Sequence, residues 1–109
     1  MPEWIQNYYI AEGVRDPEGL RRRILKGRKC FGTYLVTLSA TPGNQLEFFA
    51  ADQLRNPFRR SHCPPVVGIA HSRESALGLV VRIIEDCARQ SGSYDAGSYL
   101  RNKNCNRGG

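Results

Sequence analysis

Two short runs of alternating apolar residues lie in the middle of the chain, with a turn sequence between them. Residues 31–40, FGTYLVTLSA, and residues 45–51, QLEFFAA, both place apolar side chains at alternate positions on one side. Because successive side chains of a strand point to opposite faces, this period of two is typical of half-buried strands. The intervening TPGN has the composition of a β-turn. The segment therefore predicts an antiparallel β-hairpin.

A third strand and a long helix are predicted after the hairpin. Residues 65–71, PVVGIAH, have the apolar, β-branched composition of a buried strand. Ser72 is a good cap for a helix over residues 73–90, where apolar residues recur at helical spacing, and Gly92 is a good stop. One long helix on a small, mainly antiparallel sheet predicts an α+β fold, a two-layer sandwich. The residues expected to share its core are Tyr34, Val36, Leu38, Leu46, Phe48, Val67, Ile69, Leu77, Val80 and Ile84.

The N-terminal part of the chain predicts two further short elements. Residues 4–14, WIQNYYIAEGV, are rich in aromatic and β-branched residues and favour a short strand. Asp16 suits a helix N-cap, Pro17 suits the first helical position, and Gly27 suits a helix end. Residues 16–27 are therefore expected to form a short N-terminal helix or an irregular turn.

The length and the hydropathy pattern limit the domain organisation. A chain of 109 residues has room for one hydrophobic core, so we expect a single domain over residues 1–100 and a flexible basic tail at 101–109. No apolar run is long enough to span a bilayer, and no membrane partner is expected. The first residues lack the basic start and apolar core of a secretion signal, which predicts a cytoplasmic protein. The cysteines, expected to be free thiols there, are Cys30, Cys63, Cys87 and Cys105.

The order of strands and helix resembles a known family. Residues 64–87, PPVVGIAHSRESALGLVVRIIEDC, resemble the end of the small β-β-β-α domain of HicB-type antitoxins, in which the helix opens with an acidic-Ala-Leu pattern. The resemblance covers residues 31–90 and points to a protein of bacterial type. This chain departs from the family in its longer, more basic connection at 52–64 and in having no DNA-binding domain after the helix. The resemblance therefore implies the fold more than the antitoxin role.

Basic residues are concentrated in two segments of the sequence, residues 15–29 and 55–60, and a third group lies in the tail at Arg101, Lys103 and Arg107. The net charge is +6, and arginine supplies most of the basic residues. Arginine suits phosphate binding, although a GC-rich genome also gives an arginine-rich composition. Arginine interleaved with aromatic residues predicts contact with a nucleic-acid backbone and stacking on bases, whereas the alternative is a solvated surface that keeps the protein soluble. The candidate nucleic-acid or anion-binding residues are Arg21, Arg22, Arg23, Lys26, Arg28, Lys29, Phe58, Arg59, Arg60 and His62.

The stretch PFRRSHCPP, residues 57–65, carries the most varied chemistry. Its His62 and Cys63 are adjacent, whereas zinc ligands are usually two to four residues apart, so we predict no metal, no cofactor and no catalytic residue. The leading interpretation is an exposed, extended connection between strands, stiffened by its prolines, in a non-enzymatic binding module. The alternative is a small cysteine-dependent enzyme, in which Arg59 and Arg60 lower the pKa of Cys63.

One face of the predicted hairpin is expected to point away from the long helix, and its apolar surface bears on which partners the protein has. This face carries Leu35 and Phe49 and is apolar enough to need cover beyond the one helix. The sequence therefore predicts a homo-oligomer or a protein partner in addition to nucleic acid.

Overall fold

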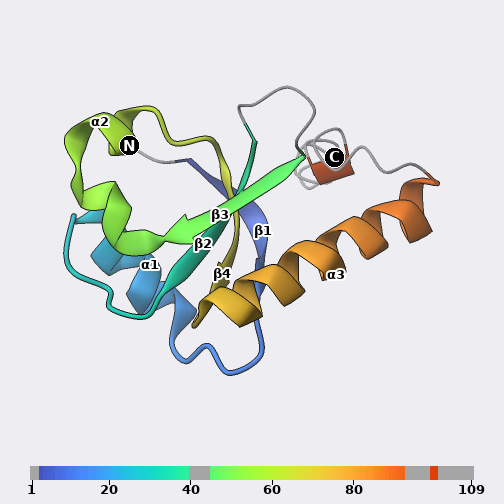
Figure 1. The fold of residues 1–109 in the computed structure, drawn as a ribbon, viewed down its shortest axis with the longest axis horizontal. Helices are drawn as coiled ribbons and strands as arrows, with labels where there is room; N and C mark the ends of the chain where they lie inside the picture. The colour runs from blue at the N-terminus through green and yellow to red at the C-terminus, as the bar shows by residue number, and fades with distance from the viewer. Residues whose placement is uncertain (1–2, 40–44, 93–98, 101–109) are drawn as a thin grey trace.

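The computed structural model describes residues 3–39, 45–92 and 99–100, and it confirms the α+β fold (Figure 1). The predicted hairpin strands, third strand, long helix and short N-terminal elements are all present. The predicted TPGN turn and the basic tail lie outside the described residues. The elements in chain order are β1 (Trp4–Ile10), α1 (Pro17–Leu25), β2 (Tyr34–Leu38), β3 (Leu46–Ala50), the 3-10 helix η1 (Ala51–Arg55), α2 (Pro57–Ser61), β4 (Val66–Ala70) and α3 (Arg73–Ser91).

The predicted helix ends are confirmed by their capping contacts. The backbone N–H of Gly19 donates to the Asp16 carboxylate at 3.1 Å, which caps α1. The N–H of Ser75 donates to the Ser72 hydroxyl at 3.0 Å at the start of α3. Gly92 ends α3 in the left-handed conformation, with a φ of 70°. No helix among the described residues is long and apolar enough to cross a membrane.

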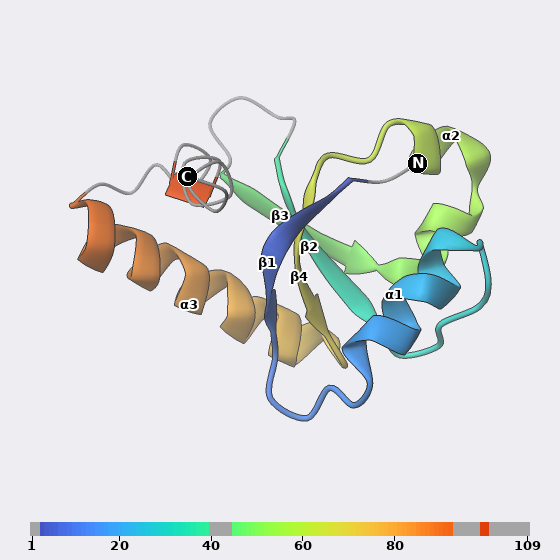
Figure 2. The same cartoon turned by 180° about the vertical axis from the view of Figure 1, so that it is seen from behind.

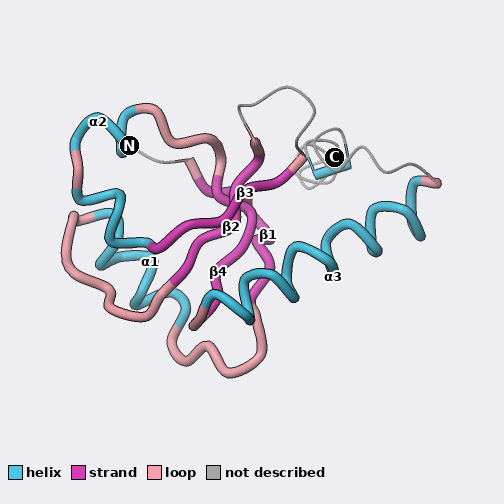
Figure 3. The backbone as a smooth tube through the Cα atoms, in the orientation of Figure 1, coloured by secondary structure: helices cyan, strands magenta, loops and turns pink. Residues whose placement is uncertain are grey.

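The four strands form one mixed sheet in the order β1-β4-β2-β3 (Figure 3). β2 pairs antiparallel with both β3 and β4, whereas β1 pairs parallel with β4. The sheet is therefore mainly antiparallel, as predicted, with the N-terminal strand added in parallel at one edge. Strand β4, the most apolar of the four, lies between two neighbours and is buried throughout.

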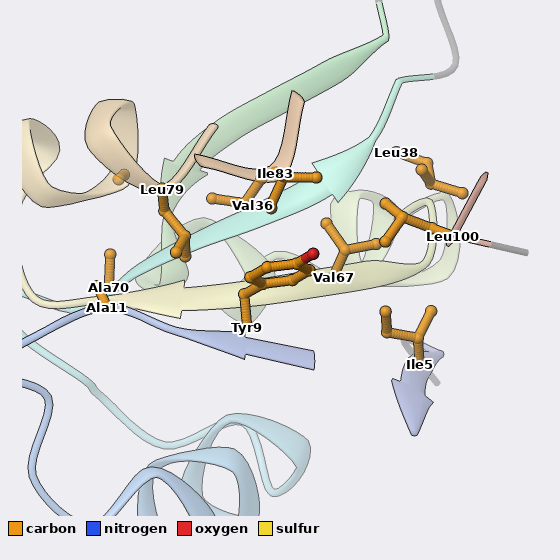
Figure 4. Close-up of a cluster of buried hydrophobic side chains, with 11 residues drawn as sticks. Ile5, Tyr9, Ala11, Val36, Leu38, Val67, Ala70, Leu79, Ile83 and Leu100 are labelled. Atoms are coloured by element: carbon orange, nitrogen blue, oxygen red, sulfur yellow. The ribbon is translucent and has the colours of Figure 1, made fainter. Parts of the chain in front are cut away.

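Helix α3 covers one face of the sheet and forms the first core cluster (Figure 4). Val36 and Val67 of the strands pack there with Leu79 and Ile83 of α3, and Leu100 joins them from beyond the helix. Ile83 and Leu100 are fully buried. This cluster gives α3 its place in the fold, because the burial of large apolar side chains is the dominant favourable term in folding.

The prediction that Leu77 belongs to the core is wrong. Its side chain is 54% exposed, and the helix buries Ala76, Leu79, Ile83 and Cys87 instead. These four residues recur every three or four positions and form one stripe along α3. Apolar residues continue past the edge of this stripe onto the solvent side. The apolar pattern of the sequence therefore predicts a wider buried face for α3 than the structure has.

Ile69 is buried, as predicted, but against the opposite face of the sheet from Val67. The pairing of β2 with β4 shifts between Val36 and Thr37, which lie opposite Gly68 and Val66. One residue of β4 is therefore inserted as a β-bulge, and strict alternation is lost there.

The remaining predicted core residues pack against the first cluster with partial burial: Tyr34, Leu46, Phe48 and Val80. Ile84 is also only partly buried.

The second face of the sheet is covered by the chain itself. Leu35 is fully buried there with Ile24 of α1 and Leu54 of η1, and Phe49 packs against this second cluster. Figure 2 shows α1 beside the sheet from this side. The expectation that this face needs cover beyond one helix is correct, but α1 and η1 supply that cover. The face therefore gives no reason to expect a protein partner.

Candidate nucleic-acid interface

The fold brings the two basic segments of the sequence together at one end of the molecule. The Arg60 guanidinium donates to the carbonyl oxygen of Leu25, where α1 ends. The backbone N–H of Cys30 donates to the Asp52 carboxylate at 2.7 Å, which ties the loop after α1 to η1. In both views α1, this loop and α2 lie together, opposite the C-terminal end of α3 (Figures 1 and 2). We call this region the basic end.

A short helix shapes the PFRRSHCPP stretch, so the prediction of an extended connection is wrong. The Asn56 side-chain oxygen accepts from the N–H groups of Phe58 at 2.9 Å and Arg59 at 3.3 Å. Pro57 occupies the first turn of α2, where its missing N–H costs nothing. The helix has no buried residue, which explains why no apolar periodicity marked it.

Most of the predicted basic residues remain exposed at the basic end. No ion pair to an acidic residue engages these exposed groups in the described part of the chain, where the two ion pairs involve Arg21 and Arg89. Their charges are therefore available to a phosphate backbone. The exposed basic residues of this region are Arg22, Arg23, Lys26, Arg28, Lys29, Arg55 and Arg59.

Several of the predicted site residues also make contacts within the protein, and Arg23 donates to the carbonyl oxygen of Lys29 at 2.8 Å. The guanidinium of half-buried Arg21 lies 5.8 Å from the ring centroid of Trp4 and 3.5 Å from the Glu18 carboxylate. Arg60 holds the end of α1 through its bond to the Leu25 carbonyl. Arg21 and Arg60 stabilise the arrangement of the basic end, and the exposed basic residues around them carry their charge at the surface.

Phe31 is a candidate site residue that the sequence analysis missed. Its side chain is 98% exposed, and that of Phe58 is 67% exposed. Both rings lie at the basic end, Phe31 in the loop after Arg28 and Lys29. The same signal that singled out Phe58, an aromatic residue beside basic ones, is present at Phe31. The alternating pattern of residues 31–40 places Phe31 in the hairpin strand, whereas β2 begins only at Tyr34.

A pocket of about 250 Å³ opens beside α2 on the second face of the sheet. We call it the α2 pocket. Thr37 and Glu47 lie directly opposite each other on β2 and β3, and both contribute to it. The residues that line the pocket are Thr37, Glu47, Phe49, Leu54, Phe58, Arg59, His62, Cys63 and Pro64.

Aromatic and polar groups alternate around the α2 pocket. The Phe58 and His62 rings are stacked with centroids 4.2 Å apart, and the Arg59 guanidinium lies 5.5 Å from the centre of the Phe49 ring. The Glu47 carboxylate accepts from the Ser39 hydroxyl at 2.6 Å. The hydroxyl oxygen of Thr37 is buried and has no hydrogen-bond partner among the described residues. The pocket therefore combines flat apolar surface with hydrogen-bonding groups.

The Cys63 thiol lacks the features of an activated nucleophile. Burial raises its pKa above the ordinary value, and the positive charge of Arg59 offsets this only in part. Its sulfur donates to the carbonyl oxygen of Pro64 at 3.2 Å. The Nδ1 atom of His62 lies 2.9 Å from the carbonyl oxygen of Phe58, so this nitrogen is already engaged away from the sulfur. The geometry favours a neutral thiol.

We expect Cys63 to react slowly with iodoacetamide at neutral pH. The reactive species is the thiolate, and because burial raises the pKa of Cys63, the thiolate population grows only in alkaline solution. The rate of alkylation at Cys63, followed by peptide mass spectrometry, should therefore keep rising beyond about pH 9. A reaction that already reaches its maximum rate at pH 7 would restore the cysteine-dependent enzyme as the better interpretation.

The cysteines and histidines of the described residues form no metal cluster. No group of three or more histidine, cysteine, aspartate or glutamate side chains gathers in a way that could hold an ion. Cys30, Cys63 and Cys87 form no disulfide bond.

Comparison with known proteins adds no information on function. No protein-family model, no curated protein and no solved structure matches the chain. The resemblance to HicB-type antitoxins stays a prediction from the sequence pattern, and the function has to be argued from the geometry of the basic end.

Proposed function

We propose that the protein is a non-enzymatic module that binds single-stranded nucleic acid through its basic end. The observation that carries the proposal is that two basic segments, distant in sequence, meet at one end of the fold and that each carries an exposed aromatic ring, Phe31 or Phe58. Basic side chains that neutralise phosphates release counterions, which supplies most of the affinity of non-specific binding. Exposed aromatic rings add stacking with unpaired bases.

The aromatic rings favour a single strand over a duplex as the ligand. The bases of a duplex are stacked on each other, and their faces are closed to a protein side chain. A single strand offers those faces, and each stacked base contributes about 1–3 kcal/mol in a sequence-tolerant way. The exposed rings of Phe31 and Phe58 can stack on such unpaired bases, which favours a single strand as the ligand.

Fluorescence anisotropy with labelled dT12 and rU12 tests the proposal. At about 50 mM salt we expect a dissociation constant of about 1–10 μM, since non-specific binding lies near 10⁻⁴–10⁻⁶ M at physiological salt. The affinity should fall as salt rises. The double substitution Phe31→Ala/Phe58→Ala should weaken binding at least about fivefold and leave the salt dependence unchanged, because stacking releases no counterions. Absence of binding even at about 50 mM salt would disprove the proposal.

A further inference from the structure

The α2 pocket and the basic end share two residues. Phe58 is one of the exposed rings of the basic end, Arg59 is one of its exposed cations, and both line the pocket. A strand whose phosphates follow the basic end would therefore pass the mouth of the pocket. A base turned away from the strand at that point can enter it without leaving the phosphate contacts.

The size and walls of the pocket suit one flat ring system. Its volume of about 250 Å³ lies below the range of about 300–1,000 Å³ that is typical of pockets for drug-sized molecules. Phe49 on β3 and the stacked pair of Phe58 and His62 give it aromatic walls. Flat aromatic surfaces bind a planar ring by stacking, as in the recognition of unpaired bases.

The polar groups of the pocket distinguish between the bases. Glu47 places a carboxylate there, and Ser39 occupies only part of its capacity, because an ionised carboxylate can accept about four hydrogen bonds. Because an ionised carboxylate only accepts hydrogen bonds, its partner has to present hydrogen-bond donors. Guanine alone presents two adjacent donors, N1–H and the 2-amino group, on its Watson–Crick edge. Adenine and cytosine place an acceptor beside their amino group, and thymine and uracil flank a single N–H with two carbonyls.

We infer that the α2 pocket is a guanine site, in which Glu47 accepts from the N1–H and 2-amino groups while Phe49, Phe58 and His62 hold the ring. This inference rests on the proposed function, since it gives the single strand a preferred base. The same chemistry would accept a free guanine nucleotide, so both sources have to be tested.

The test compares labelled dT12 with strands that carry one central guanine, adenine, cytosine or hypoxanthine. The guanine strand should bind about tenfold tighter than dT12, as expected for one good bidentate pair. Hypoxanthine lacks the 2-amino group and should lose most of that gain. Glu47→Gln should remove the preference, so that this variant binds the guanine strand no tighter than dT12. Glu85→Gln, on the exposed side of α3, is the matched control and should keep the preference. Free GMP should compete with the guanine strand more strongly than AMP does.

The outcomes separate this inference from the proposed function. Equal affinities for the guanine and adenine strands would overturn the guanine site and leave strand binding intact. A guanine preference that survives in Glu47→Gln would overturn the role of Glu47. Binding of GMP with no binding of any strand would overturn both the inference in this form and the proposed function. The base series on the wild-type protein remains decisive even if Glu47→Gln fails to fold.

Discussion

Replacing Ile83 with alanine should lower the free energy of unfolding by about 2–5 kcal/mol. Ile83 is fully buried in the cluster between α3 and the sheet. The substitution removes apolar contacts and leaves a cavity that the packed neighbours fill only in part. Since domains of this kind are stable by about 5–15 kcal/mol, the loss would be visible as a large shift in a urea unfolding curve.

Leu77→Ala on the same helix is the matched control. Leu77 is 54% exposed, so its truncation should change the free energy of unfolding by no more than about 0.5 kcal/mol. Similar losses for the two variants would show that α3 is rotated about its axis relative to the structure. A larger loss for Leu77→Ala would support the face predicted from the sequence.

The triple substitution Arg22→Ala/Lys26→Ala/Arg28→Ala should nearly abolish binding of single strands. These three residues are exposed at the basic end and line one shallow depression there. Each phosphate contact on a single strand contributes about 0.7 to the slope of log K against log salt concentration, so the slope should flatten by about two units. The affinity at about 50 mM salt should fall about 100-fold. Fluorescence anisotropy at four salt concentrations measures both quantities.

The control removes the same number of charges elsewhere. Arg73→Ala/Arg82→Ala/Arg89→Ala changes three exposed arginines of α3, a helix that packs on the opposite face of the sheet from α1. Binding should change little, because these charges lie on a helix across the sheet from the basic end and salt screens exposed charges that are far apart. If both triple variants lose the same affinity, net charge alone governs binding and the basic end is no defined site.

The features that could be predicted from the sequence are those that depend on near neighbours in the chain. Asp16, Ser72 and Gly92 were identified correctly because a cap acts on backbone groups only a few residues away. The hairpin strands followed from their alternation. The buried face of α3 depends on the sheet beneath it, and apolar residues on both sides of the true stripe hid its position. The bulge in β4 likewise depends on its pairing with β2.

The sequence could predict which residues belong to the candidate site, but it could not predict how they are arranged in space. The sequence indicated the basic segments, but it could not show that Arg60 binds the carbonyl of Leu25, because the two residues meet only after folding. Nor could it show that Arg21 lies over Trp4. The α2 pocket needs Glu47 from a strand and Cys63 from a distant connection, so no local pattern marks it.

The parallel pairing of β1 with β4 has a consequence for how the chain folds as it is synthesised. Among the strands that the structure describes, β1 with Trp4 is synthesised before the others, yet its partner Val66 belongs to β4, which is synthesised after them. The hairpin of β2 and β3 can form early, since its contacts are local. Until β4 appears, however, β1 has no strand to pair with, and the inner edge of β2 stays open. When β4 inserts between β1 and β2, it pairs with both strands at once. The sheet is therefore completed in one late step, which joins the N-terminal strand β1 to the hairpin of β2 and β3.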